Sequence, residues 1–199
     1  MNRSFIENVY YKLGVIVVAC LFSTVANAQW TLDSDKSSLH FISIKKDTIG
    51  EVHHFKKLTG TINKNNSATV IVALNSVETL IPIRNERMQS MLFHTDKFPS
   101  ATISTTINSA EIEALPVGSV TYKKVDLAVA LHGETHTYTS NIQITKSDSE
   151  TIIATTEAPI IVNAVDFKLL EGIEALRKIA GLPSIASAVP VTATLIFKK

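Results

Sequence analysis

Alternation of apolar and polar residues is the feature that most constrains how this chain can fold. Successive side chains of a β-strand point to opposite faces, so a period of two predicts strands that turn one face to a core. The clearest case is residues 125–131, where one face consists of Val125, Leu127, Val129 and Leu131. The same pattern recurs at residues 39–44, 52–62, 69–74, 101–107, 137–145, 151–162 and 191–197. About eight such segments, separated by turn residues, predict a mainly β protein built as an antiparallel barrel or sandwich.

The segment RNERMQSMLF, residues 84–93, interrupts this pattern. Asn85 is a good helix N-cap, because its side chain can accept a hydrogen bond from the first turn. Met88, Met91 and Leu92 then share one face of a helix. We predict a short capped helix in the connection between two strands. Its methionine face packs either against ordinary core or against an apolar cavity, and the sequence leaves both interpretations open.

A second helical pattern covers residues 166–182, where the apolar positions are Leu169, Ile173, Leu176 and Ala180. Gly181 is a typical helix stop, and Pro183 lies just beyond it. We predict an amphipathic helix that covers one end or one side of the sheet. No internal repeat, linker or low-complexity tract divides the β-rich part, so we expect one domain.

The first residues have the pattern of a secretory signal. A basic residue precedes an apolar run at residues 13–22, and Ala26-Asn27-Ala28 places small residues where a signal peptidase reads them. The run is too short for a comfortable membrane span. We therefore predict a signal peptide at residues 1–28, a mature domain at residues 29–199, and a periplasmic or secreted location. An N-terminal anchor helix and lipoprotein processing at Cys20 are the alternatives.

Charge balance and cysteine content exclude several classes of protein. The chain has 19 basic and 18 acidic residues, and both signs are spread along it. Nothing therefore directs the protein to nucleic acid. The only cysteine, Cys20, lies in the predicted signal peptide. We expect a mature domain without a disulfide, although an exported protein could form one.

Two histidine-containing segments raise the question of a metal site. Residues 132–136 read HGETH, but a zincin motif needs His-Glu-x-x-His on one helix face. Gly133 follows a strongly alternating strand, so we predict a tight turn between two strands. His53 and His54 are adjacent in a predicted strand and point to opposite faces, so they do not chelate one metal ion together. One of the two can face the interior and supply a polar contact there.

Catalytic machinery is not indicated by the sequence. It contains no Gly-x-Ser-x-Gly nucleophile elbow, no cysteine in the mature part and no phosphate-binding glycine loop. We therefore predict a protein that is not an enzyme, with no catalytic residues, no cofactor and no bound metal. An enzyme that uses the His132 turn is the weakest of our hypotheses, because its residues lack a workable arrangement.

Several ordered motifs resemble the YceI-like family. Its central signature is matched by Ser76-Val77-Glu78-Thr79, Arg84-Asn85-Glu86-Arg87-Met88, Leu92-Phe93 and Phe98-Pro99-Ser100-Ala101. Motifs outside that centre are Trp30-Thr31-Leu32-Asp33, Gly50-Glu51-Val52-His53-His54-Phe55 with Gly60, Leu131-His132-Gly133-Glu134-Thr135-His136, and Val165-Asp166-Phe167. The resemblance covers nearly the whole mature chain.

The chain departs from the family pattern in several places. Asn85 stands where the family usually has Asp, His136 where it has Lys, and Lys168 where it has Gly. A histidine that many members carry near residues 44–50 is absent. A ligand preference that depends on that histidine therefore does not carry over to this chain.

The resemblance implies a lipocalin-like antiparallel β-barrel with one or two short helices. Such a barrel binds an isoprenoid (quinone-like) or other long-chain fatty amphiphile in its interior, for transport, storage or sequestration. The residues that we expect around the lipid tail are Phe55, Met88, Met91, Leu92, Phe93, Leu127, Val129, Leu131 and Phe167. Those that we expect near the head group are His54, Arg84 and His132.

One alternative function and several questions stay open from the sequence. The alternative is a non-catalytic, stress-related interaction module with a filled barrel core, in which the Arg84 helix is a docking surface. Transient membrane contact and a homodimer are also open, as is whether the barrel is hollow.

Overall fold

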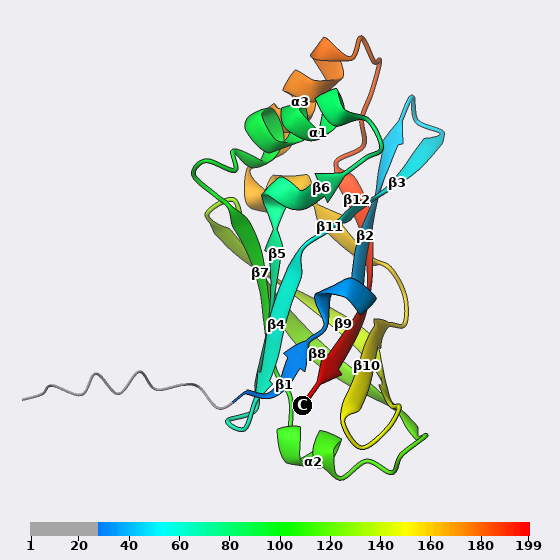
Figure 1. The fold of residues 1–199 in the computed structure, drawn as a ribbon. Coiled ribbons are helices and arrows are strands. Elements are labelled where there is room, and N and C mark those ends of the chain that lie inside the picture. Colours follow the sequence, from blue (N-terminus) through cyan, green and yellow to red (C-terminus); the bar gives the residue numbers. More distant parts are fainter. Residues whose placement is uncertain (1–27) are drawn as a thin grey trace, which may run out of the picture.

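Eight antiparallel strands close into a barrel in the computed structural model, which describes residues 28–199 (Figure 1). Around the barrel the order is β1-β4-β5-β7-β8-β9-β10-β12, and β12 pairs with β1 to complete the ring. These strands are β1 (Ala28–Leu32), β4 (Leu58–Asn63), β5 (Ser67–Ala73), β7 (Ser100–Thr106), β8 (Val120–Leu131), β9 (Glu134–Lys146), β10 (Thr151–Thr156) and β12 (Ala188–Lys198). The predicted barrel is therefore confirmed. The predicted signal peptide, with Cys20, lies outside the described residues except for Ala28.

Four further strands extend the sheet beyond one end of the barrel, here called the upper end. They are β2 (Ser38–Lys45), β3 (Ile49–Phe55), β6 (Val77–Glu78) and β11 (Ile160–Asn163). β2 pairs with β12 on one side, and β3 and then β6 follow it. β11 pairs with β12 on the other side. Two short 3-10 turns, η1 (Ser34–Lys36) and η2 (Leu74–Ser76), connect strands.

Two predicted strands are each divided in two, so their predicted extents are wrong. Residues 52–62 belong to β3 and β4, with a break at Lys57, whose amide donates to Ser76 Oγ at 3.0 Å. Residues 151–162 belong to β10 and β11, with a break that includes Pro159, which has no N–H to donate. Because apolar residues stand on both sides of each break, a period of two does not reveal it.

The helix predicted in residues 84–93 begins earlier than expected. α1 (Pro82–Arg87) continues directly into the π-helical segment η3 (Met88–Phe93). Pro82 occupies the first helical position, where its fixed φ is favourable. The prediction of Asn85 as N-cap is wrong, because its Oδ1 accepts from the Thr79 amide at 2.9 Å and from the Thr79 hydroxyl at 2.6 Å. Asn85 thereby ties the helix to the segment that follows β6.

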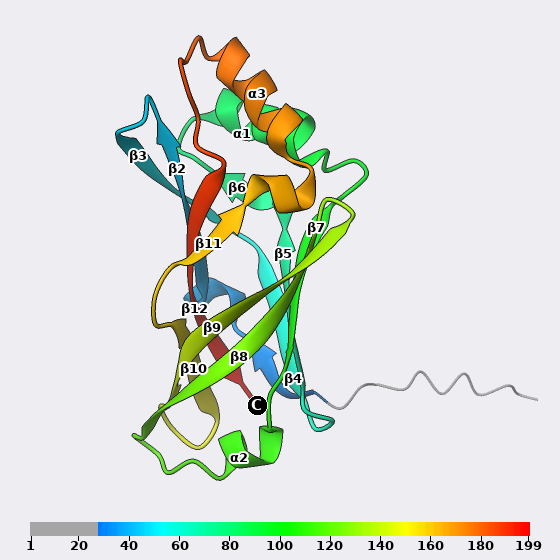
Figure 2. The same ribbon diagram turned by 180° about the vertical axis from the view of Figure 1, so that it is seen from behind.

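The second predicted helix begins later than residue 166. The chain first forms η4 (Ala164–Phe167), turns at Lys168 with a φ of 55°, and then forms α3 (Leu170–Ile179). Gly181 follows the helix with a φ of 63°, as a helix stop should. α1, η3 and α3 lie together across the upper end, and α2 (Ser109–Glu113) lies at the lower end (Figure 1, Figure 2).

The turn predicted at residues 132–136 is confirmed as a hairpin between β8 and β9. His132 and Gly133 have φ values of 53° and 82°, and Leu131 pairs with Glu134 around them. Positive φ at both central residues is typical of a two-residue hairpin loop, because its twist matches that of the strands.

Gly172 allows α3 to pack closely on η3. A Cβ atom there would lie 2.7 Å from the Met91 carbonyl oxygen and 2.8 Å from Leu92 Cα. Both are backbone atoms, so the two helical segments would have to separate. We expect Gly172→Ala to lower the free energy of unfolding by about 1–3 kcal/mol in urea titrations, although alanine itself favours a helix.

Gly50→Ala is the matched control for that variant. The nearest atom to its new Cβ would be Ile42 Cγ2 at 3.7 Å, an ordinary contact. We expect Gly50→Ala to unfold like the wild type. Equal stability of Gly172→Ala and the wild type would contradict the close packing of α3 on η3.

Candidate ligand-binding cavity

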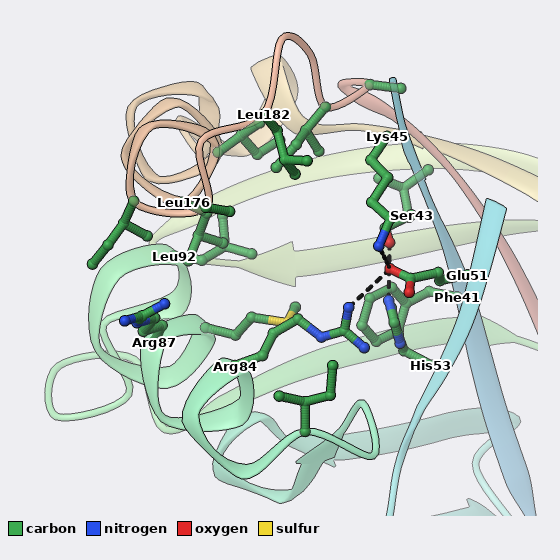
Figure 3. Close-up of a pocket in the computed structure, with 18 of the residues that line it drawn as sticks. Phe41, Ser43, Lys45, Glu51, His53, Arg84, Arg87, Leu92, Leu176 and Leu182 are labelled. Carbon is green, nitrogen blue, oxygen red and sulfur yellow. Dashed lines mark hydrogen bonds and ion pairs between the residues drawn. The ribbon is translucent and has the colours of Figure 1, made fainter. Parts of the chain in front are cut away.

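Two cavities lined by the residues that the structure describes are candidates for a ligand site. The upper cavity has a volume of about 350 Å³ and lies between α1, η3, α3 and the β2–β3 hairpin (Figure 3). The lower cavity has a volume of about 140 Å³ and lies among the barrel strands above α2. The upper cavity has the dimensions of a small-molecule site, which typically encloses about 300–1,000 Å³.

The helices supply the apolar wall of the upper cavity. Met88 and Leu92 face it from η3, and Ile173 and Leu176 face it from α3. The pairs are four and three residues apart, so each lies on one face of its helix. Met88 and Leu92 therefore border a cavity and also belong to the hydrophobic core, whereas Met91, predicted on the same face, does not line the cavity.

A charged cluster forms the opposite wall, on β2, β3 and α1. Glu51 accepts from Lys45 Nζ at 2.9 Å and from Arg84 Nη1 at 2.8 Å (Figure 3). Arg84 Nη2 also donates to the Thr79 carbonyl oxygen at 2.6 Å. The hydrogen bond from Lys45, and further the positive charge of Arg84, lower the pKa of Glu51. One carboxylate between two cations leaves this wall with a net positive charge.

Two nitrogen atoms at the same wall are buried and have no hydrogen-bond partner among the described residues. They are Arg84 Nε and His53 Nδ1. The second ring nitrogen of His53, Nε2, is hydrogen-bonded to Ser43 Oγ at 2.9 Å. A buried polar atom left unpaired costs about 1–3 kcal/mol. A ligand with an oxygen atom within reach of these nitrogens would recover that free energy, whereas a purely apolar ligand would not.

The part of the chain that the structure describes contains no group of three or more His, Cys, Asp or Glu side chains placed to hold a metal ion. Within residues 28–199, no helix is both long enough and apolar enough to cross a membrane.

All but one of the residues predicted around a lipid tail fall into three places. Met88 and Leu92 line the upper cavity, and Leu127 lines the lower one. A packed core above the lower cavity contains Phe55, Phe93, Val129, Leu131 and Phe167, which line neither. Met91 is half-buried and also lines neither cavity. Contact of these residues with a ligand stays a prediction.

Of the three residues predicted near a head group, Arg84 alone lines a cavity. His54 points away from His53, and its ring centroid lies 5.8 Å from that of His40 on the neighbouring strand. His132 donates from Nδ1 to the Phe167 carbonyl oxygen at 3.1 Å, which fixes its ring at the β8–β9 turn. The structure therefore places these two histidines apart from Arg84.

Sequence reasoning missed most of the polar wall. The cavity-facing positions of β2 are Phe41, Ser43 and Lys45, and those of β3 are Glu51 and His53. Their spacing of two was a usable signal. It was obscured because polar residues occupy an inward face, which is the opposite of the usual pattern of a barrel strand.

Comparison with known proteins decides the family. The model of the YceI-like domain matches residues 30–197. The chain belongs to the YceI-like family. Among solved structures, a polyisoprenoid binding domain from Saccharophagus degradans, implicated in plant cell wall breakdown, is 32% identical to this YceI-like chain, with a TM-score of 0.85. That match covers 86% of this chain and 98% of the other.

A second solved structure similar to this YceI-like chain is BcnA of Burkholderia cenocepacia. It is 16% identical, with a TM-score of 0.64, and the match covers 83% of this chain and 98% of the other. At this identity the likeness concerns the fold alone. No curated protein matches the chain significantly.

His53 should make the stability of the YceI-like domain depend on pH. Its burial, and then the positive charge of Arg84, lower its pKa, so the folded protein binds this proton less tightly than the unfolded chain. The free energy of unfolding should therefore fall as pH drops below about 6.5, the ordinary histidine pKa. We expect His53→Gln to reduce this slope in urea titrations between pH about 8 and about 5. An identical slope in the variant and the wild type would contradict the burial of a neutral His53.

Proposed function

We propose that this YceI-like protein is an exported carrier of an isoprenoid, quinone-like amphiphile, which it binds for transport, storage or sequestration. The observation that carries the proposal is the upper cavity, whose wall from η3 and α3 is apolar and whose opposite wall holds Arg84 of α1 with Glu51 and His53 of β3. A molecule with a long apolar tail and one polar end matches both walls. The similarity to a polyisoprenoid binding domain over most of both chains supports the same class of ligand.

The tail would supply most of the binding free energy. Burial of apolar surface contributes roughly 0.8 kcal/mol for each CH₂ group. A chain of several isoprene units can therefore bind tightly without covalent chemistry, and we propose a binding protein with no catalytic step.

The head group would lie against the charged cluster. Arg84 Nε and His53 Nδ1 are the buried nitrogens without partners among the described residues. A carbonyl oxygen, such as that of a quinone, can accept a hydrogen bond from Arg84 Nε, because a guanidinium donates from all of its nitrogens. This orientation places the tail toward the helices and the barrel.

Loading from a membrane would use the apolar rim of the upper cavity. Ile81 and Ile83, at the start of α1, line the cavity and are also exposed, and Leu80 beside them is 85% exposed. We propose that this rim contacts the membrane transiently while the amphiphile passes.

The test of the proposed ligand is organic extraction of protein purified from its native compartment, followed by mass spectrometry. Ala186 lines the upper cavity, so we expect Ala186→Trp to fill it and to reduce the extracted isoprenoid lipid about tenfold, equivalent to roughly 1.4 kcal/mol. Ala188→Trp is the matched control, because Ala188 is exposed at the start of β12. We expect that control to carry as much lipid as the wild type. A folded wild-type protein from which no lipid can be extracted would contradict the proposal.

Export has its own test, because it depends on residues 1–28. The mass of the protein purified from its native cells should correspond to a chain that begins at Gln29, since Ala26-Asn27-Ala28 is the expected cleavage site. A lipidated Cys20 at the N-terminus would support the lipoprotein alternative and contradict cleavage after Ala28.

A further inference from the structure

The sheet extension above the barrel divides its side chains between two faces in an unusual way. Toward the upper cavity, β2 and β3 turn mostly polar side chains, including Lys45 and Glu51. Because successive side chains of a strand alternate, the residues between them point to the opposite face. That face, here called the outer face, consists of Ile161 and Asn163 on β11, Ala188, Pro190 and Thr192 on β12, His40, Ile42 and Ile44 on β2, and Gly50, Val52 and His54 on β3.

A row of apolar side chains crosses the outer face from strand to strand. Ile161 pairs with Pro190, and Ile42 pairs with Val52. The register between β12 and β2 continues by one step to bring Pro190 beside Ile42. Val52 and Ile161, at the two ends of the row, are 63% and 48% exposed. A contiguous exposed apolar patch is typical of an interaction site.

No α-helix covers the outer face in the part of the chain that the structure describes. α1 and α3 lie on the cavity side of the extension, and α2 lies at the lower end of the barrel (Figure 1, Figure 2). The apolar residues of the row lie outside the hydrophobic core. A sheet normally buries its apolar face against another layer, so this face lacks a layer within one copy of the chain.

The charge of the outer face indicates what covers it. The face contains no lysine, arginine, aspartate or glutamate. An anionic bilayer surface attracts apolar patches that carry basic residues, and this patch carries none. The whole chain has a formal net charge of only +1 at pH 7, so two copies do not repel each other strongly. An uncharged apolar face on a chain of this kind fits a second copy of the same face.

We propose that two copies of the chain pack outer face against outer face in a symmetric dimer. Its two-fold axis runs along the strands between β12 and β2, so that β12 of each copy packs on β2 of the other. Ile161 of one copy then meets Val52 of the second copy, and Pro190 meets Ile42. The inference concerns the face turned away from the upper cavity and does not rest on the proposed function.

This axis matches apolar residues with apolar ones and polar residues with polar ones. It places Ala188 against Ile44, and Thr192 against His40, whose ring nitrogens can hydrogen-bond to the threonine hydroxyl. A two-fold axis across the strands would exchange the two ends of each strand. It would then place His40 of one copy against Ile44 of the other, which leaves a polar ring against an aliphatic side chain.

The size of the outer face sets the expected strength of the dimer. Four strands about 4.8 Å apart, each with up to about five residues of 3.4 Å, give a flat area of roughly 300 Å² per copy. Standard interfaces bury about 800 Å² per partner. We therefore expect a reversible dimer with a dissociation constant in the micromolar range.

Sedimentation equilibrium of the purified protein, at loading concentrations from about 1 to about 300 µM, tests the dimer. We expect the wild type to pass from monomer to dimer within this range. Val52→Lys puts a charge into the apolar row and should raise the dissociation constant more than about tenfold. Val117→Lys is the matched control, because Val117 is also 63% exposed but lies in the connection between α2 and β8. We expect that control to dimerise like the wild type.

Ile161→Glu tests the arrangement from a second strand and keeps the test decisive should Val52→Lys not fold. Alone, it should also give a monomer. The double variant Val52→Lys, Ile161→Glu places opposite charges against each other at both ends of the row. We expect it to dimerise again, with a dissociation constant within about tenfold of the wild-type value. Circular dichroism spectra that match the wild type show that each variant is folded.

The outcomes that would overturn the inference are distinct. A wild type that stays monomeric at the highest concentration would overturn the dimer. Flotation of that monomer with vesicles of phosphatidylethanolamine and phosphatidylglycerol, lost in Val52→Lys, would assign the outer face to a membrane instead. A dimer that survives both single substitutions uses another surface, which also overturns the inference. A folded but monomeric double variant would overturn the two-fold arrangement.

Discussion

Strand β12 pairs with four other strands, and the rest of the structure depends on this sharing. Its C-terminal part pairs with β1 and β10 and closes the barrel, whereas its N-terminal part pairs with β2 and β11 beyond the barrel. Each side of a strand offers one row of hydrogen-bonding groups, so β1 and β2 follow one another along one side of β12. The sheet therefore extends beyond the closed barrel, and this extension faces α1 and α3. The upper cavity is the space between that wall and those helices.

The charged cluster in this space connects stability with binding. Glu51 on β3 joins Lys45 on β2 to Arg84 on α1, so one carboxylate holds a strand hairpin and a helix in place. These side chains are partly buried, which makes the removal of one partner more costly than at a fully exposed ion pair. The same arrangement leaves Arg84 Nε buried without a partner among the described residues. A carbonyl-bearing ligand would complete the hydrogen bonding of a group that the fold already holds in position.

The barrel could be predicted from the sequence because the alternation of apolar and polar residues within each strand identifies the face that points inward. Val125 and Leu127 mark that face on β8. The strand breaks at Lys57 and Pro159 could not be predicted, because the alternation of apolar and polar residues continues on both sides of each break. The helical segment formed by α1 and η3 was found from the methionine face of η3. Asn85 was nevertheless assigned the wrong role, because its partner, Thr79, lies in the preceding loop. The spacing of two at Glu51 and His53 was a signal for part of the polar wall. The pairing of Glu51 with Arg84 was not predictable, since these residues are 33 positions apart and meet only when the sheet and the helices are assembled.

A crystal structure of the protein with the amphiphile that it carries from its native compartment tests the central claim most directly. We predict an isoprenoid tail in the upper cavity, between η3, α3 and the β2–β3 hairpin. We also predict an oxygen atom of its head group within hydrogen-bond distance, about 2.7–3.2 Å, of Arg84 Nε. An amphiphile bound outside both cavities, or an upper cavity filled by the side chains of α1 and α3, would contradict the account.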